Sequence, residues 1–331
     1  MRNPNLPQKT ELEILEDKTI LVAGAAGFIP SHICEFYLEK GAKVIGLDNF
    51  ITGSHDNIEY LCRYKHFDFH EANIYESLPS LSREKIDFIF SMASPASPID
   101  FERLPLEIMR VNSEGTRQLL EVARQHNARF LEASTSEVYG DPEVHPQTES
   151  YNGCVNPIGP RSCYVQSKRY AEALTMTYHR YYGLDTRIIR IFNTYGPRMR
   201  PNDGRVIPNF INQALKGQAL TVHGDGSQTR SFCYISDLVQ GLHRVMFSDE
   251  TTPFNCGNPD EHTILDLAKL IVSTLQSDST IAFTGLPEDD PRRRCPDIQK
   301  LQDISDYQPH VSLQEGIQMT ASYFKQIAEK S

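Results

Sequence analysis

The residues with the clearest chemical potential are a tyrosine and a lysine four positions apart, Tyr164 and Lys168, in the sequence YVQSK. In a helix, positions i and i+4 lie on the same face, so these two side chains are neighbours. A lysine ammonium beside a phenol favours the ionised phenolate, which can remove a proton near neutral pH. The pair therefore indicates a proton-transfer site, although the same spacing occurs by chance in many helices.

Three more polar residues, Thr135, Ser136 and Glu137, follow an apolar run at residues 129–133 (RFLEA) that is predicted to be a strand. In open α/β folds, ligands bind at the carboxyl ends of the strands. We therefore expect these side chains to share one edge of a sheet with the tyrosine–lysine pair. Asn112, within VNSEGT, is a candidate for a water or backbone contact near the lysine. Local hydrogen bonding within its own helix is an equally good alternative.

A glycine-rich segment, GAAGFIP at residues 24–30, follows the apolar run at residues 19–23 and opens a helical pattern. Backbone amides in such a strand-to-helix turn face a pyrophosphate. Asp48, at the end of the second apolar run, can accept hydrogen bonds from a ribose 2′-hydroxyl and repels a 2′-phosphate, which favours NAD over NADP. Pro30 replaces the usual third small residue. Because its missing N–H falls in the first helical turn, we expect the helix to survive and the cofactor affinity to change.

The elements that position these groups alternate between short apolar runs and helical patterns. The runs that predict strands are residues 19–23, 43–47, 86–92, 129–133 and 186–191. Helical patterns separate most of them, including residues 105–125 and 162–182. This alternation predicts βαβ units, and right-handed crossovers then give an open, doubly wound parallel sheet.

The texture of the sequence changes after Asn193, where proline and glycine become frequent and the helical patterns shorten to residues 206–216, 264–275 and 313–325. We therefore predict an N-terminal arm at residues 1–17, a dinucleotide-binding domain at residues 18–192 and a smaller lobe at residues 193–331. The segment at about residues 232–254 is a candidate to return to the first domain.

Composition limits the classes of partner. The chain has 331 residues and a formal net charge of −10, which disfavours nucleic acid or an anionic membrane as the main partner. It contains no apolar stretch that predicts a signal peptide or a membrane span. The seven cysteines are scattered and form no CxxC pair, so we expect neither disulfides nor a metal site. The expected location is a reducing compartment, the cytoplasm.

Longer segments give a more specific signal than any single motif. The glycine motif, Asp48, the threonine after the strand and the tyrosine–lysine pair together resemble an extended short-chain dehydrogenase/reductase. Within that superfamily, the chain strongly resembles the UDP-glucuronate decarboxylases (UDP-xylose synthases) from about residue 91 to residue 237. The segments that carry this resemblance are ASPASP, STSEVYGDPEVHPQ, NPIGPR, RIFNTYGPRM, NDGRVIPNF and GSQTRSFCYISDLV.

The resemblance implies a Rossmann-like fold with a smaller C-terminal substrate-binding lobe, NAD as cofactor, a nucleotide-sugar substrate and a homodimer. The catalytic residues that it implies are Thr135, Glu137, Tyr164, Lys168 and Arg294. The implied cofactor contacts are Gly24, Gly27, Phe28, Ile29, Asp48, Asn49, Asn73, Ala93, Asn112, Tyr164 and Lys168. The implied substrate contacts are Ser136, Asn193, Arg205, Asn209 and Arg230.

Several alternatives stay open. A sugar 4,6-dehydratase would carry an acidic residue at Ser136, and a simple 4-epimerase usually lacks Glu137, so the pattern favours decarboxylation. An oxidising decarboxylase that releases a 4-keto pentose with NADH is barely distinguished from the full cycle. A non-catalytic NAD-binding protein is the alternative from another class. The departures from the decarboxylase pattern are Pro30, Asn73, Asn152, Cys154 and Cys295.

Overall fold

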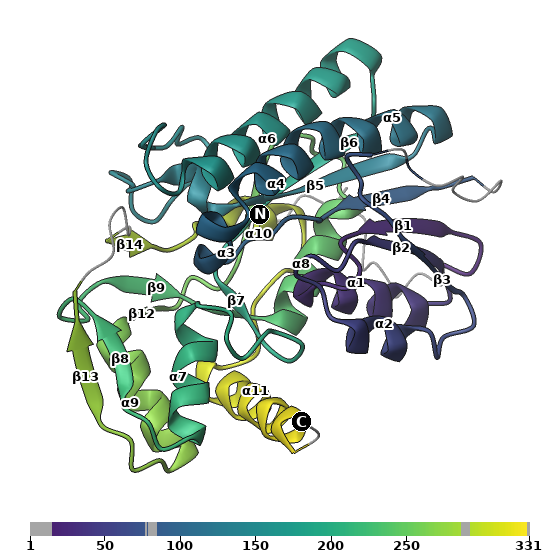
Figure 1. The fold of residues 1–331 in the computed structure, drawn as a ribbon. Coiled ribbons are helices and arrows are strands. Elements are labelled where there is room, and N and C mark those ends of the chain that lie inside the picture. The colour runs from purple at the N-terminus through teal and green to yellow at the C-terminus, as the bar shows by residue number, and fades with distance from the viewer. Residues whose placement is uncertain (1–14, 77, 79–84, 286–291, 330–331) are drawn as a thin grey trace.

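The computed structural model describes residues 15–76, 78, 85–285 and 292–329 (Figure 1). Most of the predicted arm at residues 1–17 therefore lies outside the described residues. The centre of the molecule is a seven-stranded sheet in the order β11-β6-β5-β4-β1-β2-β3, with every neighbouring pair parallel. Its strands are β1 (Thr19–Ala23), β2 (Lys43–Asp48), β3 (Phe67–Glu71), β4 (Phe88–Ser91), β5 (Arg129–Thr135), β6 (Thr186–Ile191) and β11 (Phe254–Cys256).

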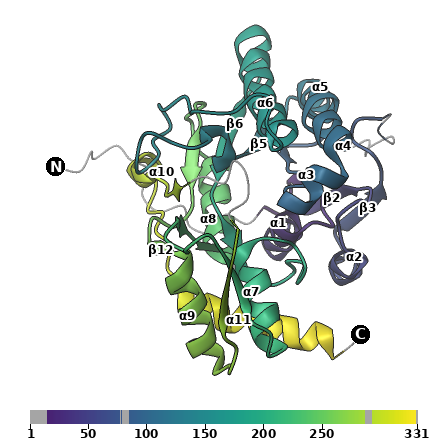
Figure 2. The ribbon, with the colours of Figure 1, turned by 60° about the vertical axis from the view of Figure 1, so that its left-hand side comes forward.

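Helices cover both faces of this sheet, as Figures 1 and 2 show. One face carries α1 (Phe28–Glu39), α2 (His55–Leu61) and α8 (Ile235–Met246). The other carries α4 (Pro105–Arg110), η1 (Val111–Gly115), α5 (Thr116–His126) and α6 (Ser162–Tyr182). Strands covered on both faces are mostly apolar, and β1 is buried at every position. The prediction of an α/β, doubly wound parallel sheet is confirmed.

Helix α1 accommodates Pro30 in its first turn and continues to Glu39. The first four N–H groups of a helix have no partner inside it, so a proline there breaks no helical hydrogen bond. Ser31, the next residue, donates its backbone N–H to Gly27 O at 3.1 Å. The expectation that the helix survives Pro30 is therefore confirmed.

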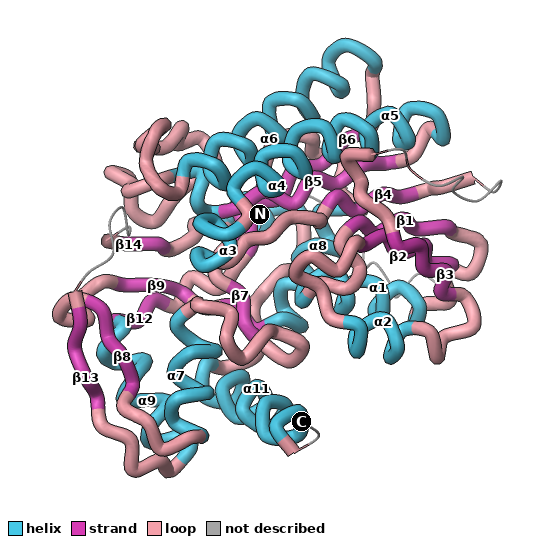
Figure 3. Tube along the Cα trace, in the orientation of Figure 1, coloured by secondary structure: helices cyan, strands magenta, loops and turns pink. Residues whose placement is uncertain are grey.

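The remainder of the chain forms smaller sheets and helices beyond the carboxyl ends of the large sheet (Figure 3). Strand β9 (Thr229–Ser231) lies between β12 (Glu261–Thr263) and β14 (Arg293–Arg294). The other strands form two pairs, β7 (Thr194–Tyr195) with β10 (Cys233–Tyr234) and β8 (Leu220–His223) with β13 (Ile281–Thr284). The helices here include α7 (Val206–Leu215), α9 (Ile264–Leu275), α10 (Gln299–Ile304) and α11 (Leu313–Ala328). The domain boundaries given above stay predictions.

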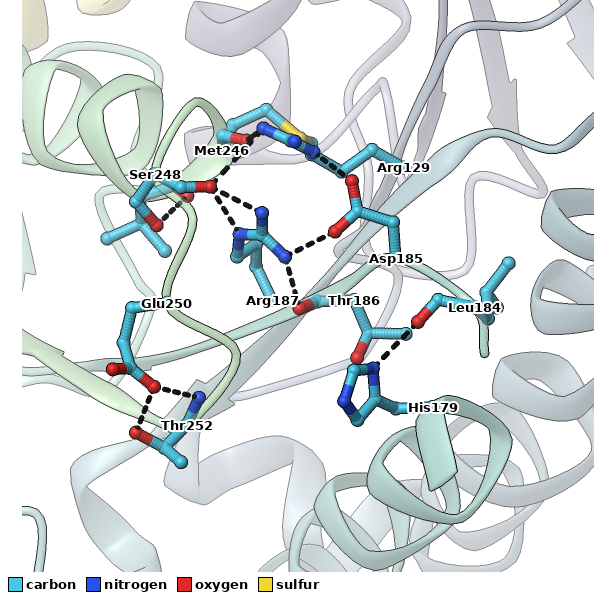
Figure 4. Close-up of polar contacts among 11 residues, drawn as sticks. Arg129, His179, Leu184, Asp185, Thr186, Arg187, Met246, Ser248, Glu250 and Thr252 are labelled. Carbon is cyan, nitrogen blue, oxygen red and sulfur yellow. Dashed lines mark hydrogen bonds and ion pairs between the residues drawn. The ribbon is translucent and has the colours of Figure 1, made fainter. Parts of the chain in front are cut away.

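An arginine network fixes the chain where it returns to the large sheet between α8 and β11 (Figure 4). Arg187 on β6 is 1% exposed and donates to Asp185 Oδ1 at 2.6 Å and to Ser248 O at 2.8 Å. Arg129 on β5 donates to Asp185 Oδ2 at 2.5 Å and to Met246 O at 3.0 Å. These contacts hold the end of α8 against β5 and β6, and so fix the edge strand β11.

Within the described residues, no helix is both long and apolar enough to span a bilayer.

Candidate active site

Most of the predicted site residues line one open pocket at the carboxyl ends of the central strands. The pocket encloses about 1640 Å³ of empty space, including its solvent-filled mouth. The predicted residues along its wall are Gly24, Gly27, Phe28, Ile29, Asp48, Asn49, Asn73, Ala93, Thr135, Ser136, Glu137, Tyr164, Lys168, Asn193, Arg205 and Arg294. Asn112, Asn209 and Arg230 do not line it.

The glycine-rich turn at one end of the pocket has the form that a pyrophosphate requires. Gly24 has φ of 85°, and a Cβ added there would lie 2.9 Å from Ala93 Cα. A larger residue would therefore be strained and would collide with the backbone after β4. Gly27 is the N-cap of α1 and makes no side-chain cap bond, and the first turn contains no acidic residue. The positive end of the helix dipole thus faces the pocket uncompensated, and these residues fit a dinucleotide.

Asp48 closes this end of the pocket at the end of β2. Its Oδ2 accepts from Ala26 N at 3.0 Å and its Oδ1 from Phe50 N at 2.7 Å. Burial raises the pKa of Asp48, and these backbone hydrogen bonds oppose that effect. Each oxygen keeps a second lone pair, which suits the acceptance of ribose hydroxyl protons. Nearby, the amide nitrogen of Asn49 donates to Asn73 Oδ1, so the carbonyl of Asn73 is already engaged.

Helix α6 brings the tyrosine–lysine pair to the middle of the pocket, where Tyr164 is 6% exposed and Lys168 is 3% exposed. The ring of Tyr164 stacks on Phe101, with centroids 4.9 Å apart and planes 19° from parallel. Lys168 Nζ donates to Ala133 O at 2.7 Å and to Glu132 Oε1 at 3.3 Å. Stacking and hydrogen bonding therefore fix both side chains before any ligand binds.

Asn112 lies behind this pair, in the π-helical turn η1. Its amide nitrogen donates to Ser94 Oγ at 3.1 Å and to Ser167 Oγ at 3.0 Å. Asn112 therefore links the helix to α6 and to the loop after β4. Insertions of this kind in helices are frequently found at functional sites.

The polar residues after β5 turn into the pocket through a short 3₁₀ helix, η2 (Ser136–Tyr139). Thr135 is its N-cap and accepts from Glu137 N at 3.2 Å through Oγ1. The hydroxyl of Thr135 can still donate to a ligand oxygen, because an N-cap uses only its acceptor. Strand β5 extends through Thr135, so the sheet itself positions this hydroxyl.

Glu137 is ionised and held by two guanidinium groups. Arg294 Nη1 lies 2.9 Å from Glu137 Oε1, and Arg161 Nη1 lies 3.2 Å from each carboxylate oxygen. Burial acts to raise the pKa of Glu137, but Arg294 and then Arg161 outweigh it and lower the pKa to about 2. Arg230 adds a smaller attraction. Arg230 therefore acts on this cluster through its charge, although it does not line the pocket.

Arg294 also carries an unused donor. It is 7% exposed, and its Nη2 is buried with no hydrogen-bond partner in the described part of the chain. Its Nη1 also reaches Asn193 Oδ1 at 3.4 Å. An unpaired buried donor costs free energy, so a ligand oxygen that reached Nη2 would bind favourably. A carboxylate suits a guanidinium best.

Arg205 and Asn209 mark the start of α7. Arg205 is the N-cap residue of this helix, donates to Ala96 O at 2.8 Å and lies 3.4 Å from Asp203 Oδ1. These contacts hold Arg205 at the wall of the pocket. Asn209 is one turn into the helix and outside the pocket lining.

Sequence reasoning did not identify two charged residues at the site. Arg161 precedes α6 within the NPIGPR segment, and its charge beside Glu137 could have been suspected from its position near the tyrosine. Glu132 lies inside the run RFLEA, where an acid in an otherwise apolar strand was the available signal. Among the residues described, no cluster of His, Cys, Asp and Glu could hold a metal ion, and all seven cysteines are free thiols.

Comparison with known proteins places these features in context. Residues 20–257 match the NAD dependent epimerase/dehydratase family. The chain is 47% identical to UDP-glucuronic acid decarboxylase 1 of Danio rerio, over 94% of this chain and 74% of that protein. It is 47% identical to UDP-glucuronic acid decarboxylase 6 of Arabidopsis thaliana, over 92% of this chain and 88% of that protein.

A solved structure of similar fold is UDP-glucuronic acid 4-epimerase from Bacillus cereus in complex with UDP-glucuronic acid and NAD. It matches with a TM-score of 0.84 and 30% identity, covering 93% of this chain and 99% of that chain.

Proposed function

This chain belongs to the NAD dependent epimerase/dehydratase family, and on that premise we propose that it decarboxylates UDP-glucuronate to UDP-xylose through a 4-keto sugar. The observation that carries the proposal is that Arg294 lines the same pocket as Thr135 and Tyr164, and that its buried Nη2 has no hydrogen-bond partner in the described part of the chain. A residue suited to carboxylate binding thus lines the same pocket as a proton-transfer pair.

The residues around the glycine-rich turn would hold NAD, with its pyrophosphate at the start of α1 and a ribose at Asp48. When bound, NAD supplies a hydride acceptor for the sugar C4 carbon and, in its reduced form, a hydride donor at the end of the cycle. The structural basis for this assignment is that Gly24 and Gly27 line the pocket and that Gly24 packs closely against the backbone of Ala93, where no side chain would fit.

Tyr164 would remove the proton of the sugar 4-hydroxyl, because a phenolate beside an ammonium is a suitable base near neutral pH. Thr135 would donate a hydrogen bond to the same sugar oxygen and so fix its position. Lys168 would favour the phenolate and bind the nicotinamide ribose. The burial of Tyr164 and its stacking on Phe101 reduce the freedom that must be lost when substrate binds.

Oxidation at C4 makes the C5 carboxylate a β-keto acid, which loses CO₂ as the C5–C6 electron pair becomes an enolate at C4 and C5. Arg294 would orient that carboxylate through Nη2, and the hydroxyls of Thr135 and Tyr164 would stabilise the enolate oxygen. Glu137, with a pKa of about 2, is a carboxylate at neutral pH and cannot itself donate a proton. It would instead orient a water molecule that protonates C5, and the hydroxide left behind would take up a proton from solvent, so that one proton is consumed for each CO₂ released.

The proposal can be tested with UDP-glucuronate that is isotopically labelled at its carboxyl carbon. We expect the parent protein with NAD to release labelled CO₂, and Arg294→Met to release it at least about 100-fold more slowly. Arg293→Met is the matched control, because Arg293 is the exposed neighbour on the same short strand, and it should behave like the parent. Turnover of the substrate without release of label would overturn the proposal.

We also infer a homodimer formed through α4 and α6, which pack against each other. Large apolar side chains are exposed on both helices, including Leu106 at 70%, Met109 at 46% and Tyr170 at 49%. Apolar groups exposed together at one surface are typical of a protein interface.

The cytoplasmic location remains a prediction, supported by the seven free thiols.

A further inference from the structure

Strand β5 carries an acid in the interior of the sheet. Glu132 is fully buried (0% exposed), and β5 itself lies between β4 and β6. The residues on either side of Glu132 in the sequence, Leu131 and Ala133, are apolar. Glutamate is almost never fully buried unless it is paired, because removing a carboxylate from water costs several kcal/mol. An apolar side chain would fill this position without that cost. A carboxylate here is therefore expected to have a specific partner that offsets the cost of its burial.

That partner is the lysine of the proposed active site. Glu132 Oε1 lies 3.3 Å from Lys168 Nζ, and the carbonyl of Ala133 accepts from the same nitrogen at 2.7 Å. An ammonium has three donors. Two of them are directed at the strand, which leaves the third for the pocket that Lys168 lines.

The other charges nearby do not take over this task. Glu172, also on α6, forms a bidentate pair with Arg190 on β6, with both contacts at 2.8 Å. Tyr164 is the remaining titratable group on the same face of α6. Ser91, which is in register with Glu132 on β4, is neutral, and so is Asn112 on η1. Glu132 is therefore the anion in direct contact with the Lys168 ammonium.

We propose that Glu132 is a positioning residue for catalysis, whose carboxylate keeps the buried Lys168 ammonium charged and points its free donor into the cofactor and substrate pocket. This inference rests on the role proposed for Lys168. It adds one residue to the catalytic group. The Lys168 ammonium favours the Tyr164 phenolate, and the Glu132 carboxylate inside the sheet in turn stabilises that ammonium. Burial raises the pKa of Glu132, and the adjacent Lys168 ammonium opposes that rise.

The charge state of Lys168 can be measured directly, without substrate, by NMR titration of protein that contains isotope-labelled lysine. The Lys168 signal is assigned by its loss in Lys168→Arg. In Glu132→Gln we expect the ammonium to lose its proton at a lower pH than in the parent, because the adjacent negative charge is gone. Glu132→Asp keeps the charge but withdraws it from Nζ, so we expect a smaller displacement in the same direction.

Glu172→Gln is the matched control, because it removes a half-buried carboxylate of α6 that is paired with Arg190 and not with Lys168. It should leave the Lys168 titration unchanged, even if it lowers the melting temperature. In parallel, calorimetry should show that the parent binds NAD most tightly, Glu132→Asp less tightly and Glu132→Gln least tightly. Both measurements are made in the absence of nucleotide sugar, so they stand whichever substrate the protein uses.

The pH profile of turnover gives the catalytic readout. We expect its alkaline limb to move to lower pH in Glu132→Gln and to stay in place in Glu172→Gln. If Glu132→Gln does not fold, the aspartate variant decides the question. A Lys168 titration that is the same in the parent and in every foldable Glu132 variant would overturn the proposal and would leave Glu132 a purely structural residue.

Discussion

Replacing Glu137 by glutamine should destabilise the protein in a strongly pH-dependent way. Burial acts to raise the pKa of Glu137, but Arg294 and Arg161 lower it to about 2, against about 4.3 for a glutamate in an unfolded chain. A difference of about 2.3 pH units, at about 1.36 kcal/mol each, gives about 3 kcal/mol at pH 7. Because the folded pKa is depressed, this stabilisation is fully present above about pH 4.3 and is lost as the pH falls towards 2.

Urea unfolding of the parent and Glu137→Gln at a series of pH values measures this effect. The free energy of unfolding should differ by about 3 kcal/mol at pH 7 and by about 2 kcal/mol near pH 3.5. Glu143→Gln, an exposed carboxylate in the segment that follows, is the control and should change stability by less than about 0.5 kcal/mol. A difference between parent and Glu137→Gln that stays constant with pH would refute the assignment of Glu137 as a carboxylate held by arginines.

Three further outcomes follow from the site and the surface. Tyr164→Phe should bind NAD like the parent in calorimetry but turn over UDP-glucuronate at least about 100-fold more slowly, and near-normal turnover would contradict its role as base. Gly24→Ala should cost about 1–3 kcal/mol of stability and weaken NAD binding, because φ is 85° and the new Cβ would lie 2.9 Å from Ala93 Cα; unchanged thermal unfolding and NAD affinity would count against this. Leu106→Glu combined with Met109→Glu should convert a dimer to a monomer in sedimentation experiments, whereas an unchanged mass would exclude this surface as the interface.

Regular elements with a strong periodic pattern were predictable from the sequence. The strand at residues 19–23, the helix at residues 162–182 and the helix at residues 264–275 have the predicted bounds. The predicted helix at residues 105–125 contains the π-helical turn η1, which depends on packing and leaves no periodic signal. Two strands of the central sheet were missed, as were the short strands of the smaller sheets. Strand β3 is a half-exposed edge strand with a polar sequence, and β11 joins the sheet from a distant part of the chain.

The candidate site was predictable where the residue type and its local motif are enough to indicate a chemical role. The glycine turn, Asp48 and the tyrosine–lysine pair all line the pocket. Glu132 was not identified because its meaning depends on Lys168, a residue far along the chain that becomes its neighbour only when α6 covers β5. Likewise, the ionisation of Glu137 follows from two arginines that the fold brings together from separate segments. The part of the site that sequence patterns do not predict therefore consists of charged residues whose partners are brought close only by the fold.

The most direct test of the central claim is the identity of the product formed from UDP-glucuronate and NAD, determined by mass spectrometry and proton NMR. The account predicts UDP-xylose, with the mass lowered by one CO₂ and no net reduction of NAD. A product of unchanged mass would make the protein a 4-epimerase, and a product lacking one water would make it a dehydratase. Accumulation of a 4-keto pentose with reduced cofactor would contradict the closed redox cycle.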